Sequence, residues 1–356
     1  MSNPMNLSNS ITAFTHLTNR AGNDVEMVLA EERLLPVTRD PTDIGLFHSL
    51  DWWSMDRMQA LWRRFEGPTW ALTVVIYGGW GLLTWCYGLL PWWLVSPLGA
   101  WFIAWQMSLQ HELIHGHPTR NRHINTALGF PPLSLWLPFA CYRTSHLAHH
   151  AGDGLTDPRR DPESFYVTGE EWSRMGPVCR MLTHANNTFA GRVLIGPGVS
   201  ITRFISAEVL LLAQGNHEQR RVWTAHGVGV VAVLAWTWGV CGISPWAYAA
   251  LFVYPGFALA LIRSFAEHRA EAEVRHRTAI VENAPVLGLL FLHNNLHVVH
   301  HEQPGLPWYE IPAAYKRDRE RFIAGNDNLV YRGYRDVASR HLLTAHHQPV
   351  HPMAAE

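Results

Sequence analysis

Two long stretches without any charged residue dominate the hydropathy pattern of the chain. The first lies between Glu66 and Glu112, and the second lies between Arg221 and Arg263. Each holds roughly forty residues, enough for two membrane-crossing helices of about 20 residues and a turn. Proline, glycine and tryptophan interrupt the stretches at 89–97 and 241–246, which is typical of tight turns at a membrane interface. The pattern therefore predicts two helical hairpins, with spans at about 69–90, 93–111, 222–241 and 246–264.

The segments that flank the predicted hairpins carry basic residues, whereas the two hairpin turns carry none. Lysine and arginine concentrate on the cytoplasmic side of membrane proteins, so both termini and the long middle segment are expected to be cytoplasmic. In a bacterium this membrane would be the inner membrane. The expected fold is an all-α integral membrane protein with four transmembrane helices as two hairpins, and a helical cytoplasmic cap. The flanking arginines are Arg57, Arg63, Arg64, Arg120, Arg122, Arg220, Arg221, Arg263, Arg269, Arg275 and Arg277.

Around the hairpins the chain divides into a cytoplasmic N-terminal segment at 1–65, a membrane domain at 66–335 and a polar tail at 336–356. No basic stretch followed by an apolar one begins the chain, so no cleaved signal peptide is expected. Two weaker apolar stretches, at 127–142 and 189–215, are broken by proline, glycine or arginine. They are expected to lie in the membrane interface or to re-enter it from the cytoplasmic side. The tail histidines His346, His347 and His351 are expected to be solvated.

Composition supports a membrane protein and narrows its partners. The chain has 17 tryptophans but only 16% charged residues, which suits a membrane interface better than an ordinary soluble enzyme. A formal net charge of -1 implies no general attraction to nucleic acid. The four cysteines lie far apart without a CxxC pair, so neither a zinc ribbon nor an iron–sulfur ferredoxin module is expected.

Histidines gather in three short motifs at the predicted cytoplasmic ends of apolar segments. "HELIH" begins at His111, "HLAHH" at His146 and "HVVHH" at His297. Spacings of three and four residues place side chains on one face of a helix. A ninth histidine, His268, lies just beyond the fourth predicted span. The motif histidines are His111, His115, His146, His149, His150, His297, His300 and His301.

Neutral imidazoles clustered in this way bind first-row transition metals. Since one zinc ion takes about four ligands, eight or nine histidines indicate two metal ions. The motifs contain no cysteine, which argues against structural zinc and copper(I), and an all-histidine site at a membrane surface suits iron that reacts with O2. A non-enzymatic metal-binding or transport protein is the alternative class. A transporter, however, places its ligands inside the spans, where His226 is the one histidine.

The order HELIH, HLAHH and HVVHH resembles the integral-membrane fatty acid desaturase and hydroxylase superfamily. So do "HGHPTRNRHIN", "DPRRDPESF" and "HHEQPGLPWYEIPAAY" near the three motifs, and the resemblance extends from about 65 to 335. It implies a di-iron centre at the cytoplasmic membrane face, held by the eight motif histidines. His268 matches a ninth histidine ligand of acyl-CoA desaturases. Those desaturases carry an asparagine one turn earlier, where this chain has Ser264.

Metal-bound histidines generally need a carboxylate or carbonyl at their second ring nitrogen. Glu112, Asp153, Asp157, Glu267 and Glu302 are close enough in sequence, and Glu267 is the preferred candidate. The residues expected to support the ligands are Glu267, Asp157, Asn294 and Ser264. Three further histidines break the ligand spacing and are expected to be supporting or surface groups; they are His117, His123 and His293.

The implied chemistry is O2-dependent oxidation of an unactivated C–H bond in a fatty acyl or other aliphatic chain. Desaturation is the first expectation, while hydroxylation and oxidative decarboxylation to a terminal alkene stay open because the ligand set does not choose among them. No catalytic residue is expected beyond the metal ligands. Aromatic residues at 127–142 are expected to line an apolar channel. Arginines that are candidates to hold a carboxylate or phosphate head group are Arg143, Arg159, Arg160 and Arg263.

Electrons for this chemistry are expected from outside the chain. The sequence has no cysteine cluster for an iron–sulfur centre, no "HPGG" haem motif and no GxGxxG after a strand. A ferredoxin-like carrier with its reductase is therefore the expected partner, together with a lipid or other aliphatic substrate in the membrane.

Overall fold

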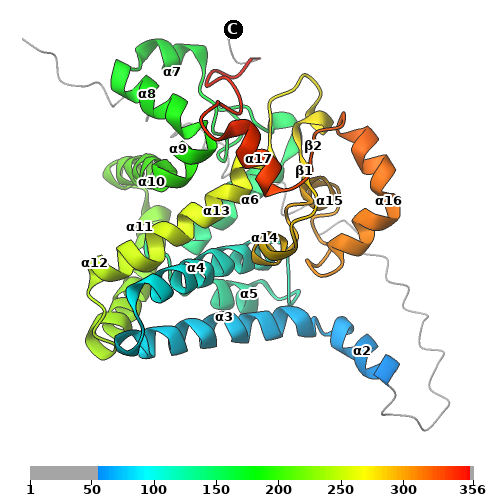
Figure 1. Ribbon diagram of the computed structural model, residues 1–356. Coiled ribbons are helices and arrows are strands. Elements are labelled where there is room, and N and C mark those ends of the chain that lie inside the picture. The colour runs from blue at the N-terminus through cyan, green and yellow to red at the C-terminus, as the bar shows by residue number, and fades with distance from the viewer. Residues whose placement is uncertain (1–54, 353–356) are drawn as a thin grey trace, which may run out of the picture.

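The computed structural model describes residues 55–352, and nearly all of its regular structure is helical (Figure 1). Most of the predicted N-terminal segment lies outside the described residues; its end forms helix α2 (Met55–Arg64). Strands β1 (Ile280–Val281) and β2 (Val330–Tyr331) are two residues each and pair in parallel. The all-α expectation is confirmed for the described part of the chain.

Helices form at all four predicted spans. Helix α3 (Gly67–Trp85) and helix α4 (Trp92–Ile114) are joined by a 3-10 turn, η1 (Tyr87–Leu89). Helix α11 (His217–Leu234) continues into the π-helical η3 (Ala235–Val240). The following rod consists of α12 (Pro245–Tyr248), the π-helical η4 (Ala249–Val253) and α13 (Tyr254–Glu267). The turn between η3 and α12 forms because Gly242 accepts a φ of 73° and the Ser244 side chain caps α12.

Within residues 55–352, three helices are long and apolar enough to cross a membrane, at 196–213, 217–240 and 245–267. The last two correspond to the predicted third and fourth spans. The first is α10 (Gly196–Ala213), which the sequence predicted to be interrupted; its proline lies in the first turn, where a missing N–H costs nothing, so the helix is continuous. Helices α3 and α4 are not among the three, since they hold seven tryptophans, which contribute little to hydropathy.

Close backbone approach joins α4 to the α12–α13 rod. A Cβ atom at Gly99 would lie 2.5 Å from the Phe252 ring, and one at Gly256 would lie 2.5 Å from Cβ of Ile103. Small residues allow membrane helices to pack tightly where the hydrophobic effect gives little drive. Because α4 also packs against α3, the C-terminal ends of α4 and α13 are held next to each other.

Shorter helices surround these C-terminal ends. Those nearest in sequence to the histidine motifs, α14 to α16, lie where α4 and α13 finish (Figure 1). The shorter elements are α5 (Arg122–Gly129), α6 (Phe139–His150), η2 (Gly152–Gly154), α7 (Gly169–Arg174), α8 (Pro177–Asn186), α9 (Phe189–Leu194), η5 (Val274–Arg277), α14 (Pro285–Leu290), α15 (His297–Glu302), α16 (Ile311–Gly325) and α17 (Tyr334–His341).

The prediction of solvated histidines in the C-terminal tail is wrong for His346 and His351, which are only 8% and 1% exposed. His346 Nε2 lies 2.8 Å from the hydroxyl of Tyr331, and His351 Nε2 lies 3.1 Å from the hydroxyl of Thr156. The backbone of the tail also forms a β-bridge at Val350. Neutral imidazoles that find hydroxyl partners are readily buried, so a tail that looks polar in sequence packs against the protein.

Candidate metal centre

The three histidine motifs lie on three helices whose ends meet. Helix α4 carries His111 in its last turn, and His115 is its C-terminal capping residue. The HLAHH motif forms the last turn of α6, and HVVHH begins α15. His268 is the C-terminal capping residue of α13. All nine predicted ligands are therefore placed by helix ends, where the chain is free to turn away from the site.

The structure brings all nine histidines together, in two groups. In each group one nitrogen from every member lies within 4.8 Å of the others. The first group consists of His111, His115, His146, His150 and His300, and the second consists of His149, His268, His297 and His301. Neighbouring histidines of one motif thus enter different groups: His149 joins the second group, while His150 joins the first. Because consecutive residues of one motif belong to different groups, the two groups lie next to each other.

Ring nitrogens face each other within both groups at hydrogen-bond distances, so the position of the ring protons decides whether each contact is attractive. His297 Nε2 lies 3.0 Å from His268 Nε2. The Nδ1 atom of His297 faces the amide oxygen of Asn294 at 2.8 Å, and that of His268 faces the carbonyl of Arg277 at 3.4 Å. These oxygen acceptors hold the ring protons on Nδ1, so both Nε2 atoms present lone pairs. Two lone pairs that face each other in a buried site are stabilised by a cation between them.

Nε2 atoms also face each other in the first group, where Glu163 lies at Nδ1 of His146. His115 Nε2 lies 2.9 Å from His146 Nε2, and His300 Nε2 lies 3.0 Å from His150 Nε2. Burial lowers the pKa of His146 despite the carboxylate beside it, so this imidazole stays neutral, as metal binding requires. Two sets of converging ring nitrogens, without thiolate among them, fit two first-row transition metal ions such as iron.

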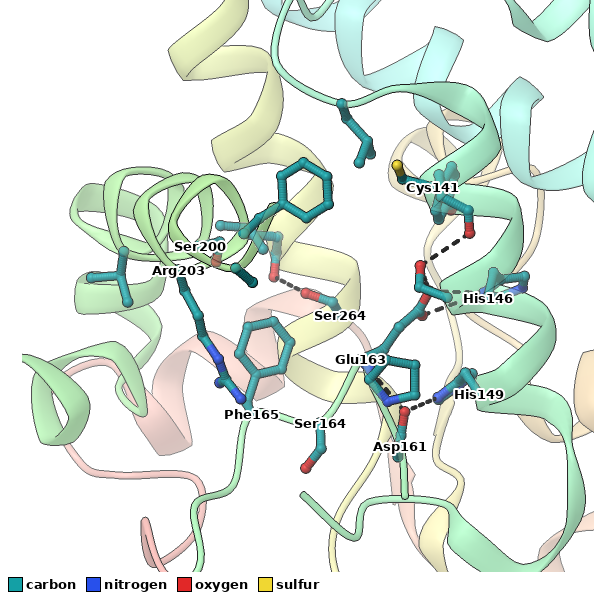
Figure 2. Close-up of a pocket in the computed structure, with 18 of the residues that line it drawn as sticks. Cys141, His146, His149, Asp161, Glu163, Ser164, Phe165, Ser200, Arg203 and Ser264 are labelled. Atoms are coloured by element: carbon teal, nitrogen blue, oxygen red, sulfur yellow. Dashed lines mark hydrogen bonds and ion pairs between the residues drawn. The ribbon is translucent and has the colours of Figure 1, made fainter. Parts of the chain in front are cut away.

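Two carboxylates that the sequence analysis did not select support the HLAHH motif. Asp161 Oδ1 lies 2.9 Å from His149 Nδ1, and Glu163 lies 3.3 Å from His146 Nδ1 (Figure 2). Burial alone would lower the pKa of His149, but the carboxylates of Asp161, Glu163 and Glu267 together outweigh it and raise that pKa to about 9. Both acids belong to the quoted "DPRRDPESF" segment, so the signal was present, but the spacing along the chain did not indicate which acid turns toward the histidines.

The four predicted supporting residues differ in what they contact. Glu267 Oε1 lies 3.4 Å from His297 Nδ1. Asn294 reaches both groups, because its Oδ1 lies 2.8 Å from His297 Nδ1 and its Nδ2 lies 3.2 Å from His111 Nε2. Asp157 accepts a hydrogen bond from the backbone N–H of Arg159 instead. Ser264 donates to the carbonyl of Leu261 and lines the cavity described below (Figure 2).

The remaining candidates have their shortest contacts with residues outside the two groups. Glu112 accepts a hydrogen bond from the backbone N–H of Trp308, at 3.1 Å, and lies 3.9 Å from His111 Nδ1. Glu302 pairs with Arg321 at 2.8 Å. His117 binds the carboxylate of Glu66 at 2.7 Å. This last contact ties the start of α3 to the loop that follows the first motif.

A cavity of about 1490 Å³ reaches the metal-binding groups from one side. His146, His149, His268 and His297 form its inner end. As the sequence predicted for the segment at 127–142, aromatic side chains line the wall, among them Trp136, Phe139 and Tyr142. Polar groups at the inner end include Glu163, Glu267 and Arg263, and the last two form an ion pair at 2.8 Å. The cavity has the size and apolar lining to admit an aliphatic chain.

Comparison with known proteins identifies the scaffold of this site. The sequence model of one family, described as fatty acid desaturase, matches residues 87–334. The matched range spans 248 of the 356 residues (334 − 87 + 1) and contains all nine histidines of the two groups. A search of curated proteins finds no match to the chain.

Proposed function

The chain belongs to the fatty acid desaturase family, and from this premise we propose that it oxidises an unactivated C–H bond in an aliphatic chain, with desaturation as the outcome. As a family member it is an oxidoreductase with a lipid substrate in a membrane context. The oxidant in the proposal is O2, and two iron ions bound by the nine histidines supply the chemistry that activates it. Hydroxylation and terminal-alkene formation are the competing outcomes that product analysis distinguishes.

The observation that carries this proposal is the convergence of lone pairs. His268 and His297 each have an oxygen acceptor at Nδ1, yet their Nε2 atoms lie 3.0 Å apart. Without a cation this contact between two lone pairs would be repulsive, and the same holds for the other ring nitrogens that converge from the ends of α4, α6, α13 and α15. The all-nitrogen donor set, combined with the family, supports iron over zinc or copper(I).

The residues of the chain have three tasks in this proposal. Asp161, Glu163 and Asn294 orient ligand rings by accepting from their Nδ1 atoms, which also fixes the tautomer that binds metal. The apolar cavity wall places one substrate carbon near the metal groups and keeps bulk water away. Electrons arrive from a separate ferredoxin-like carrier, since the sequence lacks motifs for a redox group of its own.

We further propose that α3, α4, α11–η3 and the α12–α13 rod cross the membrane as two hairpins, with both termini in the cytoplasm. Exposed tryptophans support this placement, because they concentrate where the hairpins turn. Trp85, Trp92 and Trp93 flank the first turn and are 63–69% exposed, and Trp238 and Trp246 flank the second at 62% and 85%. Indole rings favour the boundary between lipid and water. The histidine motifs lie at the opposite ends of the spans, on the side proposed to be cytoplasmic.

Metal analysis and product analysis on one preparation test the proposed function. Purified full-length protein should hold about two irons per chain and consume O2 with a reduced ferredoxin and fatty acids of graded length, giving products that mass spectrometry identifies. His297→Ala, His300→Ala and His301→Ala should each lose iron and activity. His123→Ala is a suitable control because the His123 side chain is exposed. His351 is only 1% exposed, so its replacement would also disturb packing. Stable zinc with no O2 consumption would contradict the proposal.

A further inference from the structure

Helix α10 contains two charged residues, Arg203 and Glu208, which differ in burial and in hydrogen bonding. Glu208 is 4% exposed; it accepts a hydrogen bond from Trp223 Nε1 at 2.7 Å and another from the side-chain amide of Gln219. Arg203 forms no hydrogen bond or ion pair with any residue between 55 and 352. Arg203 is exposed and opens onto the cavity. Since α10 is apolar enough to cross a membrane, an arginine on it marks a candidate functional position.

The Arg203 side chain projects from α10 into the cavity that leads to the metal-binding groups. Figure 2 shows it across the cavity from His146 and His149. Ser200 and Ser206, three residues before and after it, also line the cavity. Residues three apart share a helix face, so these polar side chains reach the cavity together with apolar ones of α10 such as Phe204 and Leu211. Val209, which is 58% exposed, does not line it.

A second arginine without a carboxylate partner lies on the same cavity wall. Arg192 is 1% exposed and lines the cavity. Its guanidinium carbon lies 3.6 Å from the centroid of the Phe165 ring, and its Nε donates to the carbonyl of Asn186 at 2.9 Å. Its Nη1 atom is buried and has no hydrogen-bond partner. Burial lowers the pKa of Arg192 to about 9, because the charged guanidinium is removed from water. A nearby anion would offset this desolvation.

The acids near the two arginines are engaged elsewhere. Glu171 is close enough to act on the charge of Arg203, but its Oε2 caps α7 by accepting from the backbone N–H of Thr168 at 2.8 Å. At the inner end of the cavity Arg263 is already paired with Glu267, and the carboxylates Asp161 and Glu163 lie beside the histidines. Glu208 of α10 also lines the cavity, but its partners are the neutral side chains of Trp223 and Gln219. Neither Arg192 nor Arg203 therefore forms an ion pair with an acid among the described residues, whereas Arg263 at the inner end does.

We propose that Arg203 binds the carboxylate of an unesterified fatty acid, with Arg192 adding positive charge behind Phe165. The inference rests on the proposed function, because it assumes that an aliphatic chain enters this cavity. A guanidinium matches the two oxygens of a carboxylate, and Arg203 lines the cavity without an ion pair to a described acid. The apolar wall formed by Trp136, Phe204 and Phe257 accommodates the chain between the arginine and the histidines.

Binding and turnover of dodecanoate test this inference in the full-length, iron-loaded protein. In Arg203→Gln the KM for dodecanoate should rise about 10- to 100-fold, the range for a lost charged hydrogen bond, while kcat changes far less. Methyl dodecanoate has no charge to pair, so its KM should not move. Arg203→Lys keeps the charge and should be intermediate. The matched control is Arg174→Gln, which removes an exposed arginine of α7 paired with Glu170.

Displacement of a fluorescent fatty acid by dodecanoate gives a second readout that needs no turnover. This assay distinguishes failure of the proposed function from failure of the carboxylate site. If the wild-type protein binds dodecanoate through Arg203 but oxidises nothing, the proposed function is wrong and the carboxylate site is supported. Equal dodecanoate affinity and KM in wild type and Arg203→Gln would overturn the site while leaving the oxidation intact. A loss confined to dodecanoyl-CoA would assign Arg203 to a phosphate-bearing head group and overturn the carboxylate.

Discussion

Replacing Asp161 with asparagine removes the charge that orients His149 and keeps the shape of the side chain. Asp161 is 4% exposed and accepts three hydrogen bonds, each at 2.9 Å. They come from His149 Nδ1, from the backbone N–H of Glu163 and from the backbone N–H of Thr156. The first two use Oδ1 and the third uses Oδ2. An asparagine has one oxygen, so in either orientation its NH2 group faces a donor.

The size of the effect follows from this count. A hydrogen bond to a charged group contributes about 1.5–3 kcal/mol, and a buried donor left without an acceptor costs about 1–3 kcal/mol. Asp161→Asn should therefore lower the free energy of unfolding by about 3 kcal/mol. Loss of a residue that orients a metal-bound histidine typically weakens metal binding 10- to 100-fold, and we expect the same range here.

Competition against a chelator of known affinity measures the metal binding, and thermal unfolding of metal-free protein measures the stability. Asp153→Asn is the matched control, because Asp153 is an exposed acid of the same loop. Iron affinity within twofold of wild type in Asp161→Asn would refute the reasoning. A loss of stability alone, with metal affinity unchanged, would show that Asp161 holds the loop together without orienting His149.

Three further predictions concern the core, the tail and the link between the two groups. Gly99→Ala should destabilise the protein by about 1–3 kcal/mol, seen as a lower unfolding temperature, because the new Cβ would lie 2.5 Å from Phe252; Gly78→Ala, with nothing within 4 Å, is the control and should be neutral or stabilising. Burial lowers the pKa of His346 to about 2 in the folded protein, whereas in the unfolded chain this histidine titrates near 6.5. The packing of neutral His346 therefore stabilises the fold fully above pH 6.5, and this stabilisation is lost as the pH falls below 6.5. Unfolding should cost about 1.4 kcal/mol less at pH 5.5 than at neutral pH, and His346→Gln should flatten this dependence; a pH-independent unfolding temperature would contradict it. Asn294→Ala should reduce iron in both groups, because it contacts one histidine of each, and loss of a single ion would show that the two groups are independent.

The sequence alone determined the features that depend on local spacing. Charge-free stretches predicted the four long helices to within a few residues. A run of about 20 residues without charge is a property of the segment itself and can be recognised without knowing what packs against it. The histidine motifs were equally visible, since spacings of three and four residues share a helix face wherever the helix lies. The position of His268 at the end of α13 also followed from where the fourth apolar segment ends.

Tertiary structure decided how these pieces combine. The HLAHH motif looks like one set of ligands, yet His149 belongs to the second group and His150 to the first, because the neighbouring helices approach it from different sides. Asp161 rather than Asp157 meets His149, and the tail histidine His351 is buried. In the sequence Arg203 is one arginine in an apolar segment, and only the placement of α10 shows that its side chain lines the cavity. Helix periodicity is a local property of the backbone, whereas contact between side chains far apart in sequence depends on the packing of the whole chain, which no local pattern contains.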